Sequence, residues 1–158
     1  MAWLKKRLHK IQRFYHLDIR EASLLVEAWL TLAWVDLTIS VVPYKRWQHW
    51  LVLKPEEVPK NRASSAEISC LIQIAEVAAR NHLRTMNCLR RSIAQQRMLN
   101  RRHISSWIHI GVKKEGDNLA AHAWLTRDDT VLNDSQDVTL RYVELKNGGW
   151  DQVKSGLF

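Results

Sequence analysis

The chain has 158 residues, 46% hydrophobic and 25% charged, a composition that excludes disordered and fibrous proteins and suits one globular domain. Lys and Arg number 24 against 16 Asp and Glu, and the resulting charge of +8 favours an anionic partner such as nucleic acid or an anionic surface. Two cysteines are too few for a disulfide-stapled secreted fold.

The first forty residues predict helices. The basic N-terminal end carries no secretory signal, so we expect a cytoplasmic protein, and residues 3–15 suit a short basic amphipathic helix that contacts either membrane or protein. Residues 22–42 are long enough to span a bilayer, but Glu27 and Asp36 would each cost roughly 2.5–3.5 kcal/mol at membrane depth. We therefore expect a core helix, capped by Asp18 and running to about residue 40, and no transmembrane span.

The middle of the chain combines an aromatic-basic stretch, a linker and two further helices. Residues 44–50 either present tryptophans to a partner or bury them, and we expect at least one to be buried. Pro55 and Pro59, with the Lys and Asn beside them, mark a linker, and Ser64 or Ser65 with Glu67 predicts a capping box that opens a helix over 65–80. A further helix over 87–101 is expected to turn Leu89, Ile93, Met98 and Leu99 inward. On that helix the polar residues are expected outward: Arg90, Arg91, Gln95, Gln96 and Arg101.

The last third of the chain changes to the periodicity of strands. Strands are predicted over 105–112, 119–125, 130–132 and 138–145, with a turn at 116–118. Helices followed by antiparallel strands indicate an α+β domain.

Cys88 is the first candidate for chemistry, because it stands where the third helix should begin. Unpaired N–H groups and the helix dipole at such an end stabilise a thiolate and lower the pKa of a thiol. The alternative is a small buried hydrophobe, and that interpretation is preferred for Cys70 in the middle of its helix. Asn87 is either a helix cap or an oxyanion donor beside the Cys88 N–H.

His122 and Asp134 are the second and third candidates. Alternation along the strand places His122 and Trp124 on the same face. If the turn at 127–129 has three residues, His122 lies directly opposite Asp134, with β-carbons about 4.5–5.5 Å apart. A two-residue turn would instead oppose His122 to Ser135. A carboxylate beside His122 would orient the imidazole toward Cys88.

Four segments in this order resemble the lasso-peptide maturation proteases: residues 88–92, 110–112, 121–125 and 134–135. The resemblance covers 62–146 well and 18–50 weakly. It implies a papain- or transglutaminase-like α+β fold in which a helix bearing the nucleophile packs on a small antiparallel sheet. We expect 1–158 to be a single domain, with an N-terminal helical part over 1–54 and a cysteine protease core over 62–146.

The resemblance also implies an activity and partners. Cys88 would be the nucleophile, His122 the base and then acid, and Asp134 the residue that orients the histidine, in a peptidase that removes the leader from a ribosomally made precursor. The chain would be the stand-alone form, which works with a separate small precursor-recognition protein and passes the core to an asparagine-synthetase-like ring-forming enzyme. No Walker motif is present, and neither a cofactor nor a metal is expected.

The alternatives belong to other classes of protein. The charge and the arginine-rich helix over 89–102 fit a basic nucleic-acid-binding domain, although no zinc, helix-turn-helix or RNA-binding signature is present. A transglutaminase-like acyl transferase and an inactive partner-binding relative also stay open.

Overall fold

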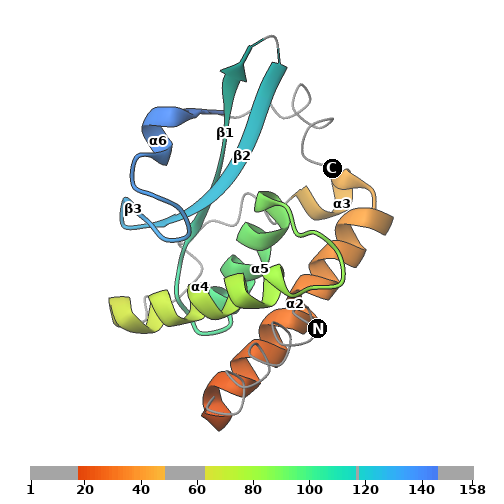
Figure 1. Cartoon of the computed structure of the whole chain (residues 1–158), viewed down its shortest axis with the longest axis vertical. Helices are drawn as coiled ribbons and strands as arrows, with labels where there is room; N and C mark the ends of the chain where they lie inside the picture. Colours follow the sequence, from red (N-terminus) through yellow and green to blue (C-terminus); the bar gives the residue numbers. More distant parts are fainter. Residues whose placement is uncertain (1–17, 49–62, 117, 146–158) are drawn as a thin grey trace, which may run out of the picture.

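The computed structural model describes residues 18–48, 63–116 and 118–145, in which helices come first and strands follow (Figure 1). The helices of the first half are α2 (Ile19–Val41), α3 (Tyr44–Trp47), α4 (Ser65–Arg80) and α5 (Cys88–Asn100). The second half contains β1 (Trp107–Glu115), β2 (Asn118–Arg127), β3 (Thr130–Val131), α6 (Val138–Arg141) and β4 (Val143–Glu144). The expected α+β class is confirmed.

Helix α2 lies against α4 and α5 and adds Leu32 and Val35 to the core. The two acids near the centre of α2, Glu27 and Asp36, face the protein. Asp36 pairs with Arg84, which precedes α5, and with Arg90, which lies on α5. The opposite stripe of α2 exposes large apolar side chains: Ile19, Val26, Leu30, Leu37 and Val41. By length and composition α2 could cross a membrane, and a soluble core helix meets the same criterion, so the cytoplasmic location stays a prediction.

Of the two helix caps predicted for α2 and α4, the one at α4 forms as predicted. Ser64 and Glu67 form the capping box at the start of α4, with Glu67 N–H to Ser64 Oγ at 3.2 Å and Ser64 N–H to Glu67 Oε2 at 2.8 Å. Asp18 stands at the N-cap of α2 but makes no side-chain capping bond there. Trp47 is buried as expected and donates its indole N–H to the Val42 carbonyl at 3.1 Å, whereas Trp50 lies outside the described residues.

Helix α5 is buried on two sides, because α2 and α4 pack on one side and the sheet packs on the other. Leu89, Ile93, Met98 and Leu99 face inward as predicted. The prediction that Gln95 and Gln96 face outward is wrong, since both are 1% exposed. Each amide is buried with a partner: Gln95 Nε2 donates to Glu76 at 2.8 Å, and Gln96 Nε2 donates to the Ser106 carbonyl at 3.0 Å.

The four strands form an antiparallel sheet in the order β3-β2-β1-β4. Asp128 and Asp129 both have positive φ, 46° and 62°, and form a two-residue turn that pairs Arg127 with Thr130. The three-residue turn is therefore wrong, and β3 ends after Val131. The predicted strand over 138–145 is also wrong in its first half, where α6 forms and buries Val138 against Trp124.

Candidate functional site

Cys88 is the first residue of α5 and is half-buried. The Asn87 side chain caps this helix by accepting the Arg90 N–H at 3.0 Å, which favours the cap over the oxyanion donor for Asn87. The N–H groups of the first helical turn have no acceptor within the helix, so the Cys88 N–H is available to a ligand oxygen.

The β2 edge at Ala123 has no strand beside it, because β3 ends at Val131. Leu125 uses its backbone groups on this edge to bind Leu132 N–H and the Asn133 side chain. Two residues back, Ala123 directs its carbonyl to the Ser92 hydroxyl at 3.2 Å and its N–H to the Cys88 sulfur. Burial raises the pKa of the Cys88 thiol, but hydrogen bonds from His122 and from the backbone outweigh it and bring the pKa below 9.0.

His122 on β2 joins Cys88 to Asp134. Its Nε2 lies 2.5 Å from Asp134 Oδ2, which leaves Nδ1 as the ring nitrogen that bonds the Cys88 sulfur. The bond with Cys88 raises the pKa of His122 above 6.5, burial opposes this, and the bond with Asp134 adds to it. Both shifts act in the direction of the charged form of this pair, in which Cys88 is a thiolate and His122 an imidazolium.

Asp134 reaches His122 from the loop that follows β3, and no strand pairing places it there. Its second oxygen accepts the Ser135 N–H at 2.7 Å and Arg141 Nη2 at 3.2 Å. Burial raises the pKa of this carboxyl, but the bonds with His122 and Ser135 outweigh burial, and the pKa falls below 3.8. The three candidate residues therefore lie in one chain of hydrogen bonds, although of the two alternative turns the one that does not oppose His122 to Asp134 is formed.

A family model described as the transglutaminase-like superfamily matches residues 23–147, which include α2 from its second turn onward and every described element after it. The chain belongs to the transglutaminase-like superfamily. This superfamily generally includes cysteine proteases and transferases, and the expected fold is confirmed. The comparison with curated proteins gave no match. The comparison with solved structures gave none either.

The aromatic rings of Trp124 and Tyr142 pack around His122, and neither residue was predicted as part of the site. Trp124 stacks on His122 with centroids 6.2 Å apart, on the face that strand alternation predicts. Tyr142, the residue that follows α6, has its ring centroid 5.0 Å from that of His122. Gly111 is paired with His122 in the sheet and has no side chain, which leaves room for Tyr142 and Trp124. Strand alternation predicts the position of Trp124, and the glycine opposite the candidate histidine is the sequence signal that leaves room for Tyr142.

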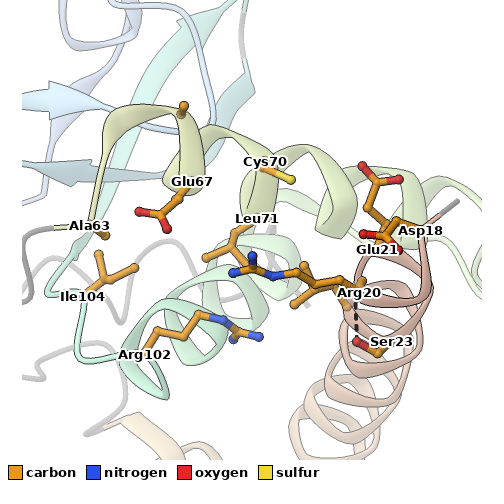
Figure 2. A pocket seen from close by; sticks show the side chains of 12 residues that line it. Asp18, Arg20, Glu21, Ser23, Ala63, Glu67, Cys70, Leu71, Arg102 and Ile104 are labelled. Carbon is orange, nitrogen blue, oxygen red and sulfur yellow. Dashed lines mark hydrogen bonds between the residues drawn. The ribbon is translucent and has the colours of Figure 1, made fainter.

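A cavity of about 950 Å³ lies elsewhere, between the start of α2 and α4 (Figure 2). Cys70, Arg20 and Arg102 line it, and none of the three candidate residues does. Cys70 is exposed, so its expected role as a buried hydrophobe is wrong. Among the described residues, no group of three His, Cys, Asp or Glu side chains is placed to hold a metal ion.

Proposed function

We propose that this chain is a cysteine peptidase that removes the leader peptide from a lasso-peptide precursor, with Cys88 as nucleophile. The observation that carries the proposal is the hydrogen-bonded series from the Cys88 sulfur through His122 to Asp134. The lasso-peptide substrate rests on the resemblance of residues 88–92, 110–112, 121–125 and 134–135 to those proteases.

In the first half of the proposed reaction, the Cys88 thiolate attacks the carbonyl carbon of the last leader residue. The carbonyl oxygen becomes an oxyanion, which the Cys88 N–H at the start of α5 can bind. His122 then gives its proton to the departing amine of the core peptide, and the C–N bond breaks. The leader remains on Cys88 as a thioester.

In the second half, His122 takes a proton from water while that water attacks the thioester carbonyl. The C–S bond breaks, the leader departs with a free carboxylate, and the thiolate and imidazolium are restored. Asp134 holds the His122 ring by Nε2 throughout, so that Nδ1 stays directed at the reacting atoms. Each proton taken up by His122 is thus returned within one cycle.

The charged side chains of α5 argue against the nucleic-acid alternative. Arg90 pairs with Asp36 at 2.7 Å, and Arg91 pairs with Glu76 at 3.1 Å. Arg102, just after the helix, contacts Glu27 at 2.6 Å. Arginines engaged by carboxylates within the fold contribute little positive potential to a phosphate backbone.

The partners of the proposed reaction follow from the same resemblance. A separate small recognition protein would bring the leader to this chain, and an asparagine-synthetase-like enzyme would close the ring on the freed core. Any use of ATP would belong to that second enzyme, since this chain has no Walker motif.

The test is mass spectrometry of the cognate precursor after incubation with this protein and its recognition partner. Cleavage should yield a leader with a free carboxylate and an intact core, whereas an acyl transferase would yield the leader joined to an added amine. Cys88→Ala should abolish cleavage, and Cys70→Ser, which changes an exposed thiol on α4, should leave it intact. Unchanged cleavage by Cys88→Ala would end the thiol-peptidase proposal, and binding of precursor without turnover by the unaltered protein would support the inactive relative.

A further inference from the structure

The residue before Asp134 makes a set of hydrogen bonds that the proposed reaction does not use. Asn133 Oδ1 accepts the Leu125 N–H at 2.8 Å on the edge of β2. Its Nδ2 donates to Ser92 Oγ at 3.1 Å and to Gln95 Oε1 at 2.7 Å, both on α5. Ser92 and Gln95 are 0% and 1% exposed, so Asn133 joins the loop of Asp134 to the buried side of the helix that begins with Cys88.

The bonds of Asn133 continue from α5 into α4 and back toward the nucleophile. Gln95 Nε2 donates to Glu76 Oε1 at 2.8 Å, and Arg91 Nη1 donates to Glu76 Oε2 at 3.1 Å. Arg91 Nε also binds the carbonyl of Met86, close before Cys88, at 3.0 Å. A continuous polar network therefore connects the loop of Asp134 with residues just before and just after the first turn of α5.

We propose that Asn133 is a positioning residue, which fixes the loop of Asp134 against α5 and thereby aligns His122 with the Cys88 sulfur. The proposal rests on the proposed function of Cys88, His122 and Asp134. A site of this kind needs its groups within about 0.5 Å of the productive geometry. Since β3 ends at Val131, no backbone hydrogen bonds between strands hold Asp134. The side-chain hydrogen bonds of Asn133 hold this loop instead.

The same loop provides a matched control. Gln136 is also an amide, and it makes two bonds to the backbone of Val131, with Nε2 to the carbonyl at 2.9 Å and Oε1 to the N–H at 3.2 Å. Those bonds stay within the segment after β2 and do not touch α5. Gln136→Ala therefore weakens the loop without releasing it from the nucleophile helix.

The experiment measures the rate of Cys88 alkylation by iodoacetamide across pH, in a Cys70→Ser background so that a single thiol reacts. Alkylation follows the thiolate, so its midpoint reports whether His122 is still held beside the sulfur. Asn133→Ala should raise the midpoint and lower the rate at neutral pH by about three- to tenfold, tenfold being one pKa unit. Gln136→Ala should keep the parent's midpoint. With the cognate precursor, Asn133→Ala should lower kcat and leave KM unchanged.

Equal midpoints in the parent and in folded Asn133→Ala, or an equal rise in both alanine variants, would overturn the positioning role. If Asn133→Ala fails to fold, Gln95→Met decides, because it removes the 2.7 Å acceptor of Asn133 on α5 and changes little volume. A raised midpoint in Gln95→Met supports the proposal and an unchanged one overturns it. A parent whose Cys88 titrates like a free thiol would contradict the proposed function itself, which separates the two failures.

Discussion

Replacing Gly111 by alanine tests how closely the sheet packs around His122. Gly111 lies opposite His122 in the β1–β2 ladder. A β-carbon there would lie 2.9 Å from Tyr142 Cβ, 2.9 Å from Trp124 Cη2 and 3.0 Å from Trp124 Cζ3. Ordinary carbon–carbon contacts lie at about 3.5–4.0 Å, so the neighbours must move by roughly half an ångström.

The cost of that movement can be estimated from the neighbours. Trp124 is 1% exposed and cannot swing into solvent, and the contact with Tyr142 is made by its β-carbon, which moves only with the backbone. Overpacking of this kind costs typically 1–3 kcal/mol, and alanine's lower unfolded entropy returns about 0.4–1 kcal/mol. We expect Gly111→Ala to lower the free energy of unfolding by about 1–2 kcal/mol, measured by urea denaturation.

A second effect should accompany the loss of stability. Tyr142 and Trp124 both pack against His122, so a shift of either ring should move the imidazole and slow the alkylation of Cys88. Gly116→Ala is the control, because it also places alanine at a glycine but in the left-handed region, with φ +61° and no described atom within 4 Å. That variant should cost about 1 kcal/mol from backbone strain and leave the reactivity of Cys88 unchanged.

The reasoning about Gly111 would be refuted if Gly111→Ala kept both the stability and the thiol reactivity of the parent. A further check is the pair Gly111→Ala and Trp124→Phe, since phenylalanine lacks the outer ring atoms that the new β-carbon meets. The double variant should lose less stability than the sum of the single variants.

Three other predictions concern the site and its supports. His122→Ala should slow leader removal roughly a hundredfold more than Asp134→Asn, because the first removes the base and the second only misorients it. Equal activity of Asp134→Asn and the parent would show that another residue orients His122. Because its hydrogen bonds hold the pKa of folded Asp134 below 3.8, the ionised carboxylate stabilises the fold above the unfolded pKa, and this contribution is lost as the pH falls through the folded pKa. The difference in unfolding free energy between the parent and Asp134→Asn should thus be present at neutral pH and close in acid, and a constant difference in urea titrations would contradict the assignment. Asp36→Ala should cost about 3 kcal/mol, because it leaves the largely buried Arg90 without its carboxylate. Glu27→Ala should cost about 1 kcal/mol, because its partners Arg101 and Arg102 are more exposed, and equal midpoints in thermal melts would disprove this ranking.

Features set by neighbouring residues could be predicted from the sequence. Ser64 and Glu67 stand at the spacing of a capping box, and the structure starts α4 there. Cys88 was expected at the start of a helix, and α5 begins with it. Both depend on hydrogen bonds within a single turn of chain, for which local sequence carries the needed information.

Features set by distant packing could not be predicted in the same way. Helical periodicity identifies one buried face, but α5 packs against helices and sheet together, so Gln95 and Gln96 are buried as well. Their partners, Glu76 and the Ser106 carbonyl, lie on other elements and cannot be recognised from spacing within α5. The two-residue turn at Asp128 and Asp129 was one of two open alternatives, because both lengths are compatible with the same residues.

The short β3 explains how Asp134 meets His122 despite this turn. The observed register pairs Thr126 with Val131, so a longer β3 would place Asp134 opposite Ala123 and on the other face of the sheet from His122. The same extension would use the Ala123 N–H in the ladder and take it away from the Cys88 sulfur. Because β3 ends at Val131, the Ala123 N–H is free to bond the Cys88 sulfur, and the Asp134 carboxylate can reach His122. The loop that results has no ladder to fix it, which is why the bonds of Asn133 to α5 matter for the alignment of the site.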